Sequence, residues 1–103
     1  MLYILICKDK PEDGLARRME TRPDHLAYLD SLGEKLRIAG AMLSGDAKQP
    51  HASVLVIEAG SMGEARAIAD ADPYAKAGVF AEVEIHPFRQ AAGFVPLGAS
   101  DSS

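Results

Sequence analysis

Two residues that lie far apart in the sequence, His25 and Asp72, have side chains that could transfer protons. An imidazole titrates near neutral pH, so His25 could act as a general base or a general acid. A carboxylate within reach would orient such a ring. The alternative is a partly buried histidine that bonds a backbone carbonyl or Asp24, and the position alone favours this structural role.

Asp72 belongs to a segment with the pattern of one capped helical turn. Asp72 fits the N-cap, because its side-chain oxygen can accept from backbone N–H groups of the next turn. Pro73 fits the first helical position, and Gly78 fits the residue after the turn, where φ is positive. Local sequence therefore favours a capping role, and a second role in orienting His25 requires the two side chains to meet.

Three further residues are candidates for contact with a ligand. Tyr74 could line a pocket or donate a hydrogen bond, although a core aromatic fits equally well. Arg22 could bind an anionic substrate, but solvation or an ion pair with Glu20 or Asp24 is the ordinary alternative. Ser44 could point into a cleft, and nothing in its local sequence distinguishes it from any other serine.

Four strands are expected to position these residues. The segments 2–7 and 52–58 are apolar on both faces, which predicts two central strands. Residues 41–44 read as a shorter strand. Residues 82–87 alternate between polar and apolar, which is typical of a half-exposed edge strand, and the proline in this segment agrees with an edge position.

Two amphipathic helices are expected between the strands. We expect the first over 22–37, opening at Arg22-Pro23 and ending near Gly40, after a possible short helical turn over 15–19. Its apolar stripe consists of Leu26, Leu29, Leu32 and Leu36. His25 shares this stripe, and Arg18 and Arg22 extend it if the helix starts earlier. The second helix follows a capping box at 61–64.

The order β-α-β-β-α-β with right-handed crossovers predicts an α+β fold. Its antiparallel sheet has four strands in the order 4-1-3-2, with both helices on one face. The other face is also apolar, so a second copy packed sheet to sheet, a homodimer, is expected to cover it. We expect one domain over 1–89 and a partly flexible tail over 90–103, in which only 94–97 docks.

Composition excludes several classes of function. The 103 residues are 48% hydrophobic and 25% charged, as in one soluble globular domain. The net charge is −4, and no Lys/Arg cluster with interleaved aromatics occurs, which argues against nucleic-acid binding. No apolar run approaches the roughly 18 residues that span a bilayer, and Met1 is not followed by a basic signal segment. Membrane insertion and secretion are therefore not expected.

Cysteine and histidine positions argue against a metal site. Cys7 is the only cysteine, lies in an apolar run and is expected to be a core thiol in a reducing, cytoplasmic setting. His25, His51 and His86 have no metal-ligand spacing. No nucleotide-binding glycine motif and no G-x-S-x-G is present. We therefore expect neither a metal nor another cofactor.

An ordered set of short segments resembles the YciI-like (YCII-related) family over about residues 1–88. The segments are Met1-Leu2-Tyr3, Arg22-Pro23-Asp24-His25-Leu26, Ala69-Asp70-Ala71-Asp72-Pro73-Tyr74, Ala77-Gly78-Val79 and Pro87-Phe88. The resemblance implies a ferredoxin-like, dimeric α/β-barrel fold and an active-site His–Asp pair, which His25 and Asp72 match. Most members have no assigned reaction, but the family is similar to enzymes acting on hydroxylated or chlorinated aromatic rings. This chain has Gly45-Asp46 where the family usually has Gly-Pro, and its loop there looks short, so a different cleft edge is expected.

We therefore predict a small cytoplasmic homodimer that binds a small molecule. His25 would accept or donate a proton, Asp72 would orient it, and Arg22, Tyr74 and Ser44 would contact the ligand. The reaction would be an elimination or isomerisation on a small, oxygenated compound, aromatic or non-aromatic, as in a dehydrochlorinase-like lyase or an isomerase. One alternative is a non-catalytic metabolite-binding or interaction module in which Asp72 only caps. Another is a metal-dependent oxygenase, which would require bound metal.

Overall fold

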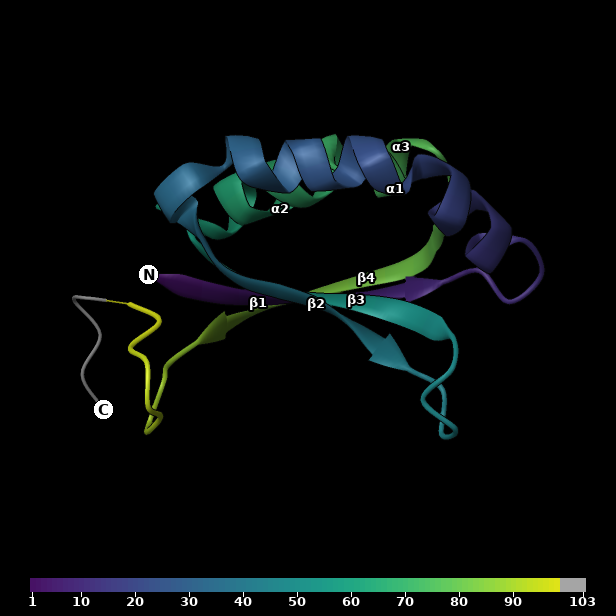
Figure 1. Cartoon of the computed structure of the whole chain (residues 1–103). Helices are drawn as coiled ribbons and strands as arrows, with labels where there is room; N and C mark the ends of the chain where they lie inside the picture. Colours follow the sequence, from purple (N-terminus) through teal and green to yellow (C-terminus); the bar gives the residue numbers. More distant parts are fainter. Residues whose placement is uncertain (99–103) are drawn as a thin grey trace.

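The computed structural model, which describes residues 1–98, has one four-stranded antiparallel sheet with a layer of helices on one face (Figure 1). The elements in chain order are β1 (Leu2–Asp9), α1 (Gly14–Ser31), the 3-10 turn η1 (Gly33–Lys35), β2 (Leu36–Leu43), β3 (Pro50–Glu58), α2 (Met62–Ala71), the one-turn helix α3 (Pro73–Lys76) and β4 (Phe80–Phe88). The strand order β2-β3-β1-β4 is the predicted 4-1-3-2 order taken from the other edge, so the predicted topology is confirmed.

The two central strands, β1 and β3, supply most of the core. They pair antiparallel with Leu5 opposite Leu55, and alternate residues on each strand face the helices. The buried cluster on this side contains Tyr3, Leu5, Cys7, Leu55, Ile57, Ala59, Ala65, Ile68 and Ala69. Small alanines on α2 allow that helix to lie close to the sheet. Cys7 is a buried core thiol, as predicted, and burial raises its pKa to about 12.

Helix α1 begins eight residues earlier than the sequence predicted. It starts at Gly14, whose N–H donates to the Lys10 carbonyl, and continues through Pro23 in its interior. Proline cannot donate to the carbonyl four residues before it, so Pro23 was expected near a helix start. The early start places Arg18 and His25 on one continuous helix, seven residues apart.

The end of α1 also differs from the prediction, because the chain leaves the helix after Ser31. Gly33 adopts φ +58°, a conformation that glycine tolerates, and η1 then leads into β2 at Leu36. Leu36 still packs against the core, but from a strand paired with Ile57. The predicted helix over 22–37 and the predicted strand over 41–44 were therefore wrong in their bounds, and Gly40 lies within β2 rather than at a helix end.

The described part of the tail is held mainly through its backbone. The Leu97 carbonyl accepts from Arg37 Nη1 at 2.8 Å, and the Leu97 N–H bonds the side chain of Gln90. The prediction that 94–97 docks therefore holds for Leu97 but not for Phe94, whose side chain is fully exposed. Residues 99–103 of the predicted tail lie outside the described residues. In the described part of the chain, no helix has the length and apolar character to cross a bilayer.

Candidate active site

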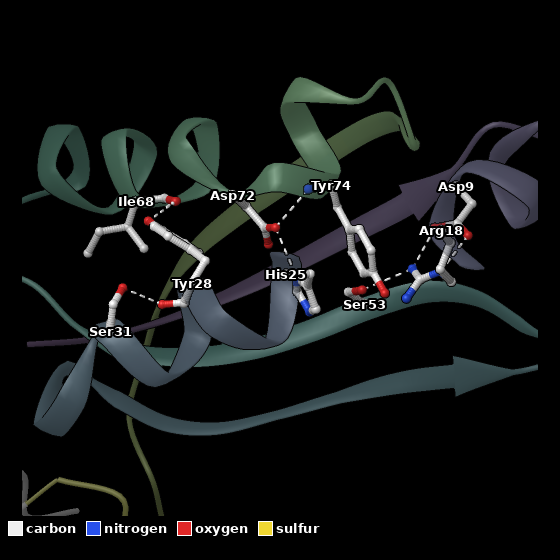
Figure 2. A network of polar contacts seen from close by, with 9 residues as sticks. All are labelled: Asp9, Arg18, His25, Tyr28, Ser31, Ser53, Ile68, Asp72 and Tyr74. Atoms are coloured by element: carbon white, nitrogen blue, oxygen red, sulfur yellow. Dashed lines mark hydrogen bonds and ion pairs between the residues drawn. The ribbon is translucent and has the colours of Figure 1, made fainter. Parts of the chain in front are cut away.

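His25 and Asp72 meet between helix α1 and the junction of α2 with α3. Their side chains are joined by a 2.8 Å hydrogen bond between His25 Nδ1 and Asp72 Oδ1 (Figure 2). Both residues are buried, with 7% and 3% of their surfaces exposed. The two side chains are therefore in direct contact although they lie 47 positions apart in the chain, as the pair that the family resemblance implies requires.

The α3 turn fixes the position of the Asp72 carboxylate. Asp72 caps α3, and its Oδ1 accepts from the Tyr74 backbone N–H at 2.9 Å. Pro73 occupies the start of the turn, and Gly78 closes it with φ +78°. The predicted cap is therefore present, and the same oxygen that caps the helix also bonds His25.

This contact determines which nitrogen of the imidazole faces a ligand. An ionised carboxylate only accepts hydrogen bonds, so Nδ1 carries the hydrogen that lies between His25 and Asp72. In the neutral ring the opposite nitrogen, Nε2, then has a free lone pair. No hydrogen bond of Nε2 is found within residues 1–98. Nε2 is therefore the atom available for proton transfer.

The His25 ring stacks on the Tyr74 ring, and Arg18 in turn contacts the Tyr74 ring. The rings of His25 and Tyr74 are parallel within 7°, with their centroids 3.8 Å apart. The Arg18 guanidinium lies 4.8 Å from the centroid of the Tyr74 ring, a cation–π contact. Phe80 meets Tyr74 edge to face at 6.0 Å. Rotation of the His25 ring is consequently restricted on one side by Tyr74 and at Nδ1 by Asp72.

Arg18 is held by a buried ion pair at the end of β1. Its Nε and Nη2 donate to the two carboxylate oxygens of Asp9 at 2.8 and 2.7 Å, and Nη2 also donates to Ser53 Oγ at 2.9 Å. Burial opposes the charged form of Arg18, but the hydrogen bonds and charge of Asp9 outweigh it and raise the pKa of Arg18. Arg18 therefore stays a cation in this setting.

A cavity of about 190 Å³ adjoins these side chains. Its polar wall consists of Arg18, Arg22, His25, Ser53 and Tyr74. Leu26, Leu29 and Leu55 contribute apolar surface. The cavity thus combines the lone pair of a histidine with cationic and hydroxyl groups, as in sites where a few polar groups orient a small molecule.

Four of the five predicted site residues come together, and one does not. His25, Arg22 and Tyr74 line the cavity, and Asp72 lies directly behind His25. Ser44 lies at the turn between β2 and β3, where its hydroxyl bonds Asp46, and it lines a different cavity. A ligand-binding role for Ser44 remains an untested prediction.

The site also contains Arg18, Ser53 and Asp9, which were not predicted as site residues. A signal for Arg18 was present, because it lies on the same helical face as His25 once the helix starts early. Asp9 and Ser53 carried no local signal, since they meet Arg18 only through the register of the sheet. No group of three or more potential metal ligands occurs among the described residues.

Comparison with known proteins identifies the family. The sequence model of the YCII-related domain matches residues 1–89. Protein YciI from Escherichia coli O6:H1 is 40% identical over 97 residues, which cover 87% of this chain and 98% of that protein. An uncharacterized protein from Haemophilus influenzae is 31% identical with the same coverage.

A solved structure shares the fold closely. It is 5-chloro-2-hydroxyhydroquinone dehydrochlorinase (TftG) from Burkholderia phenoliruptrix AC1100 in complex with 2,5-dihydroxybenzoquinone. The TM-score is 0.81 at 33% identity, and the match covers 88% of this chain and 96% of that chain. The fold and the site together define an α+β protein of the dimeric α/β-barrel fold class. Within that class, the chain belongs to the YCII-related family.

Proposed function

We propose that this protein is an enzyme that moves protons on a small, oxygenated ring compound, with His25 as the acid–base group. The observation that carries the proposal is the 2.8 Å contact between His25 Nδ1 and Asp72 Oδ1 at the wall of a cavity. The contact leaves Nε2 as the base, and the Asp72 charge stabilises the imidazolium that forms.

In the proposed reaction, His25 Nε2 takes a proton from a ring hydroxyl and returns it to a ring carbon. The oxygen keeps its electron pair and forms a carbonyl, while the carbon gains a C–H bond, which is an isomerisation of enol to ketone. Where that carbon carries chloride, loss of chloride with its bonding pair and of a proton from a second hydroxyl completes an elimination of HCl. Both reactions need one positioned acid–base group and no oxidant.

Similarity to the dehydrochlorinase supports this choice of substrate class. That protein is named for its action on 5-chloro-2-hydroxyhydroquinone, and the bound compound in its structure is a dihydroxyquinone. Both molecules have one six-membered ring with several oxygens. We infer that this chain accepts single-ring compounds of the same kind.

The proposal is tested with a panel of chlorinated and unchlorinated hydroquinones and hydroxyquinones. Chloride release and changes in ultraviolet absorbance report elimination, and absorbance alone reports isomerisation. The enzyme proposal predicts turnover of at least one panel member and its loss in His25→Gln. Tight binding of panel members without turnover would favour a non-catalytic binding module instead.

We also propose a cytoplasmic homodimer that packs through the sheet face away from the helices. Two apolar side chains of β2, Ile38 and Met42, are 49% and 42% exposed on that face. A second copy would cover them and the apolar residues of the central strands. The cytoplasmic location rests on the single, buried cysteine, because Cys7 requires no oxidising compartment.

A further inference from the structure

Beside His25, the cavity wall carries a second cluster of polar groups, formed by Arg18, Ser53 and Tyr74 (Figure 2). We propose that this cluster, called here the oxyanion subsite, binds an anionic oxygen of a single-ring ligand, a phenolate or an enolate. The inference rests on the proposed function in taking the His25 cavity as the substrate site. It adds the ionisation state of the bound substrate, with one ring oxygen held as an anion.

The two hydroxyl groups of the subsite have hydrogens available for a ligand. Ser53 Oγ accepts from Arg18 Nη2 at 2.9 Å, and the Arg18 guanidinium also lies 4.8 Å from the centroid of the Tyr74 ring. A guanidinium can only donate, so the Ser53 oxygen acts as an acceptor toward Arg18 and its hydrogen stays free. Within residues 1–98, neither hydroxyl is seen to donate to another group. Because both residues line the cavity, an acceptor inside the cavity is the partner that these hydrogens lack.

The charge around the cavity favours an anion over a neutral oxygen. Arg18 and Arg22 both line the cavity, and no aspartate or glutamate does. The Arg18 charge is balanced by Asp9 behind the wall, whereas no ion pair of Arg22 is found in the described part of the chain. Burial raises the pKa of Tyr74 against the opposing charges of the two arginines, so its hydroxyl remains a donor at neutral pH. The wall thus offers positive charge and donors together.

The cavity is large enough for a ligand with one ring. Its volume is about 190 Å³, and a dry cavity of about 150 Å³ is known to admit benzene. Leu29 and Leu55 supply apolar surface for the faces of such a ring.

The oxyanion subsite would also assist the proposed proton transfer. A ring oxygen held as an anion delivers electron density to the ring carbons, which makes one of them easier to protonate. His25 lies in the same cavity wall, its ring stacked on that of Tyr74. The subsite would therefore stabilise the anion formed when a hydroxyl loses its proton, while His25 holds that proton.

The probe for this subsite is 4-nitrophenol, because its phenolate and its phenol absorb at different wavelengths and it titrates near neutral pH. Titration of the probe with and without an excess of the full chain gives the protonation state that the cavity prefers. Nitrobenzene, which lacks the oxygen, is the matched neutral probe. The expected result is tighter binding of the phenolate, seen as ionisation of the bound probe at a lower pH than the free probe.

Two substitutions remove one donor each, Ser53→Ala and Tyr74→Phe. Each is expected to weaken phenolate binding by about tenfold, while nitrobenzene binds within about twofold of wild type and shows that the cavity is intact. Matched controls are Tyr28→Phe and Ser31→Ala, whose hydroxyls bond backbone carbonyls outside the cavity. Both controls should keep the phenolate preference.

Three results would overturn the subsite. The first is that wild type binds the phenolate no more tightly than the phenol. The second is that both Ser53→Ala and Tyr74→Phe keep the wild-type preference for the phenolate. The third is that only His25→Gln loses this preference, which would mean that a protonated His25 binds the anion. The measurement is made at equilibrium and requires no turnover. Failure of the proposed enzyme function would therefore leave its result unchanged, and the two failures can be told apart.

Discussion

The imidazole of His25 and the phenol ring of Tyr74 lie face to face, 3.8 Å apart between centroids and 7° from parallel. This stack depends on the Asp72 cap, because the Tyr74 N–H is one of the two donors to Asp72 Oδ1. One carboxylate oxygen thus positions both members of the ring pair. Replacing Asp72 with alanine should therefore lower both stability and turnover, whereas a substitution that keeps the acceptor oxygen should lower mainly turnover.

Substitution of Asp72 by Ala and by Asn separates capping from chemistry. Asp72→Ala loses the cap and leaves the His25 Nδ1–H unpaired, which should lower the free energy of unfolding by about 2–4 kcal/mol. Asp72→Asn keeps an acceptor oxygen and should cost only about 1 kcal/mol, but it removes the charge that stabilises the imidazolium, so turnover should fall at least about 100-fold. Urea unfolding and turnover assays measure the two effects.

The control for the two Asp72 substitutions is Ser61→Ala at the N-cap of α2, where Ser61 accepts from the Glu64 N–H. It should cost about 1 kcal/mol of stability and leave turnover unchanged. Full activity in Asp72→Asn would show that Asp72 is a cap and nothing more.

Because Arg18 and Asp9 form a buried ion pair, the loss of stability caused by replacing one of them should depend on whether the other is present. Arg18→Met leaves the Asp9 carboxylate, 6% exposed, without a counter-charge and should destabilise the fold by about 3–5 kcal/mol. Adding Asp9→Leu removes that stranded charge and should recover at least about 2 kcal/mol. Denaturant unfolding of both single variants and the double variant measures the interaction between the two residues. If the two single losses of unfolding free energy simply add up in the double variant, the prediction is contradicted.

The raised pKa of Cys7 predicts a loss of stability at alkaline pH. Burial, followed by the negative charge of Asp72, raises this pKa from 9.0 to about 12. Between these values the unfolded thiol loses its proton and the folded thiol keeps it, so the unfolded state binds fewer protons and stability falls as pH rises. The slope should reach about 1.4 kcal/mol per pH unit at most.

Comparison with Cys7→Val isolates this contribution. Tyr28 and Tyr74 also have raised pKa values, but they contribute equally in both proteins. The difference in unfolding free energy between wild type and Cys7→Val should therefore change above pH 9 and stay constant below it. A constant difference from pH 7 to pH 11 would rule out a protected thiol.

The proposed homodimer predicts that a charge on the exposed sheet face separates the copies. Ile38→Glu should convert a dimer to a folded monomer, because a carboxylate buried between two sheets loses its hydration. Met19→Glu, on the exposed surface of α1, is the control and should leave the dimer intact. Sedimentation of wild type as a monomer at micromolar concentration would contradict the proposal.

The sequence predicted the sheet order and the Asp72 turn correctly, because both follow from strong local patterns. Continuous apolar runs marked β1 and β3 as central, and the Asp-Pro-Tyr segment with Gly78 marked a capped turn. The bounds of α1 could not be predicted from its leucines. Leu36 fits the spacing of the helical stripe, yet it occupies a strand because Gly33 breaks the helix first.

The prediction of the site was limited by contacts that only tertiary structure creates. The contact between His25 and Asp72 depends on how α1 packs beside α3, which no spacing along the chain encodes. Asp9 lies beyond the strand predicted over 2–7, but β1 extends to it and places its carboxylate against Arg18. The Arg18 end of the cavity was therefore missed, although Arg18 lies on the predicted face of the helix.

Solvent deuterium exchange tests the central claim, proton transfer by His25, most directly. Isomerisation and elimination share the step in which a ring carbon takes up a proton, so wild type in D₂O should incorporate deuterium into a single-ring hydroquinone or hydroxyquinone, as followed by NMR. His25→Gln should exchange at least about 100-fold more slowly. His51→Gln, changed at an exposed histidine that lines a different cavity, should match wild type. Equal exchange rates in wild type and His25→Gln, or no exchange in wild type across the panel, would contradict the claim.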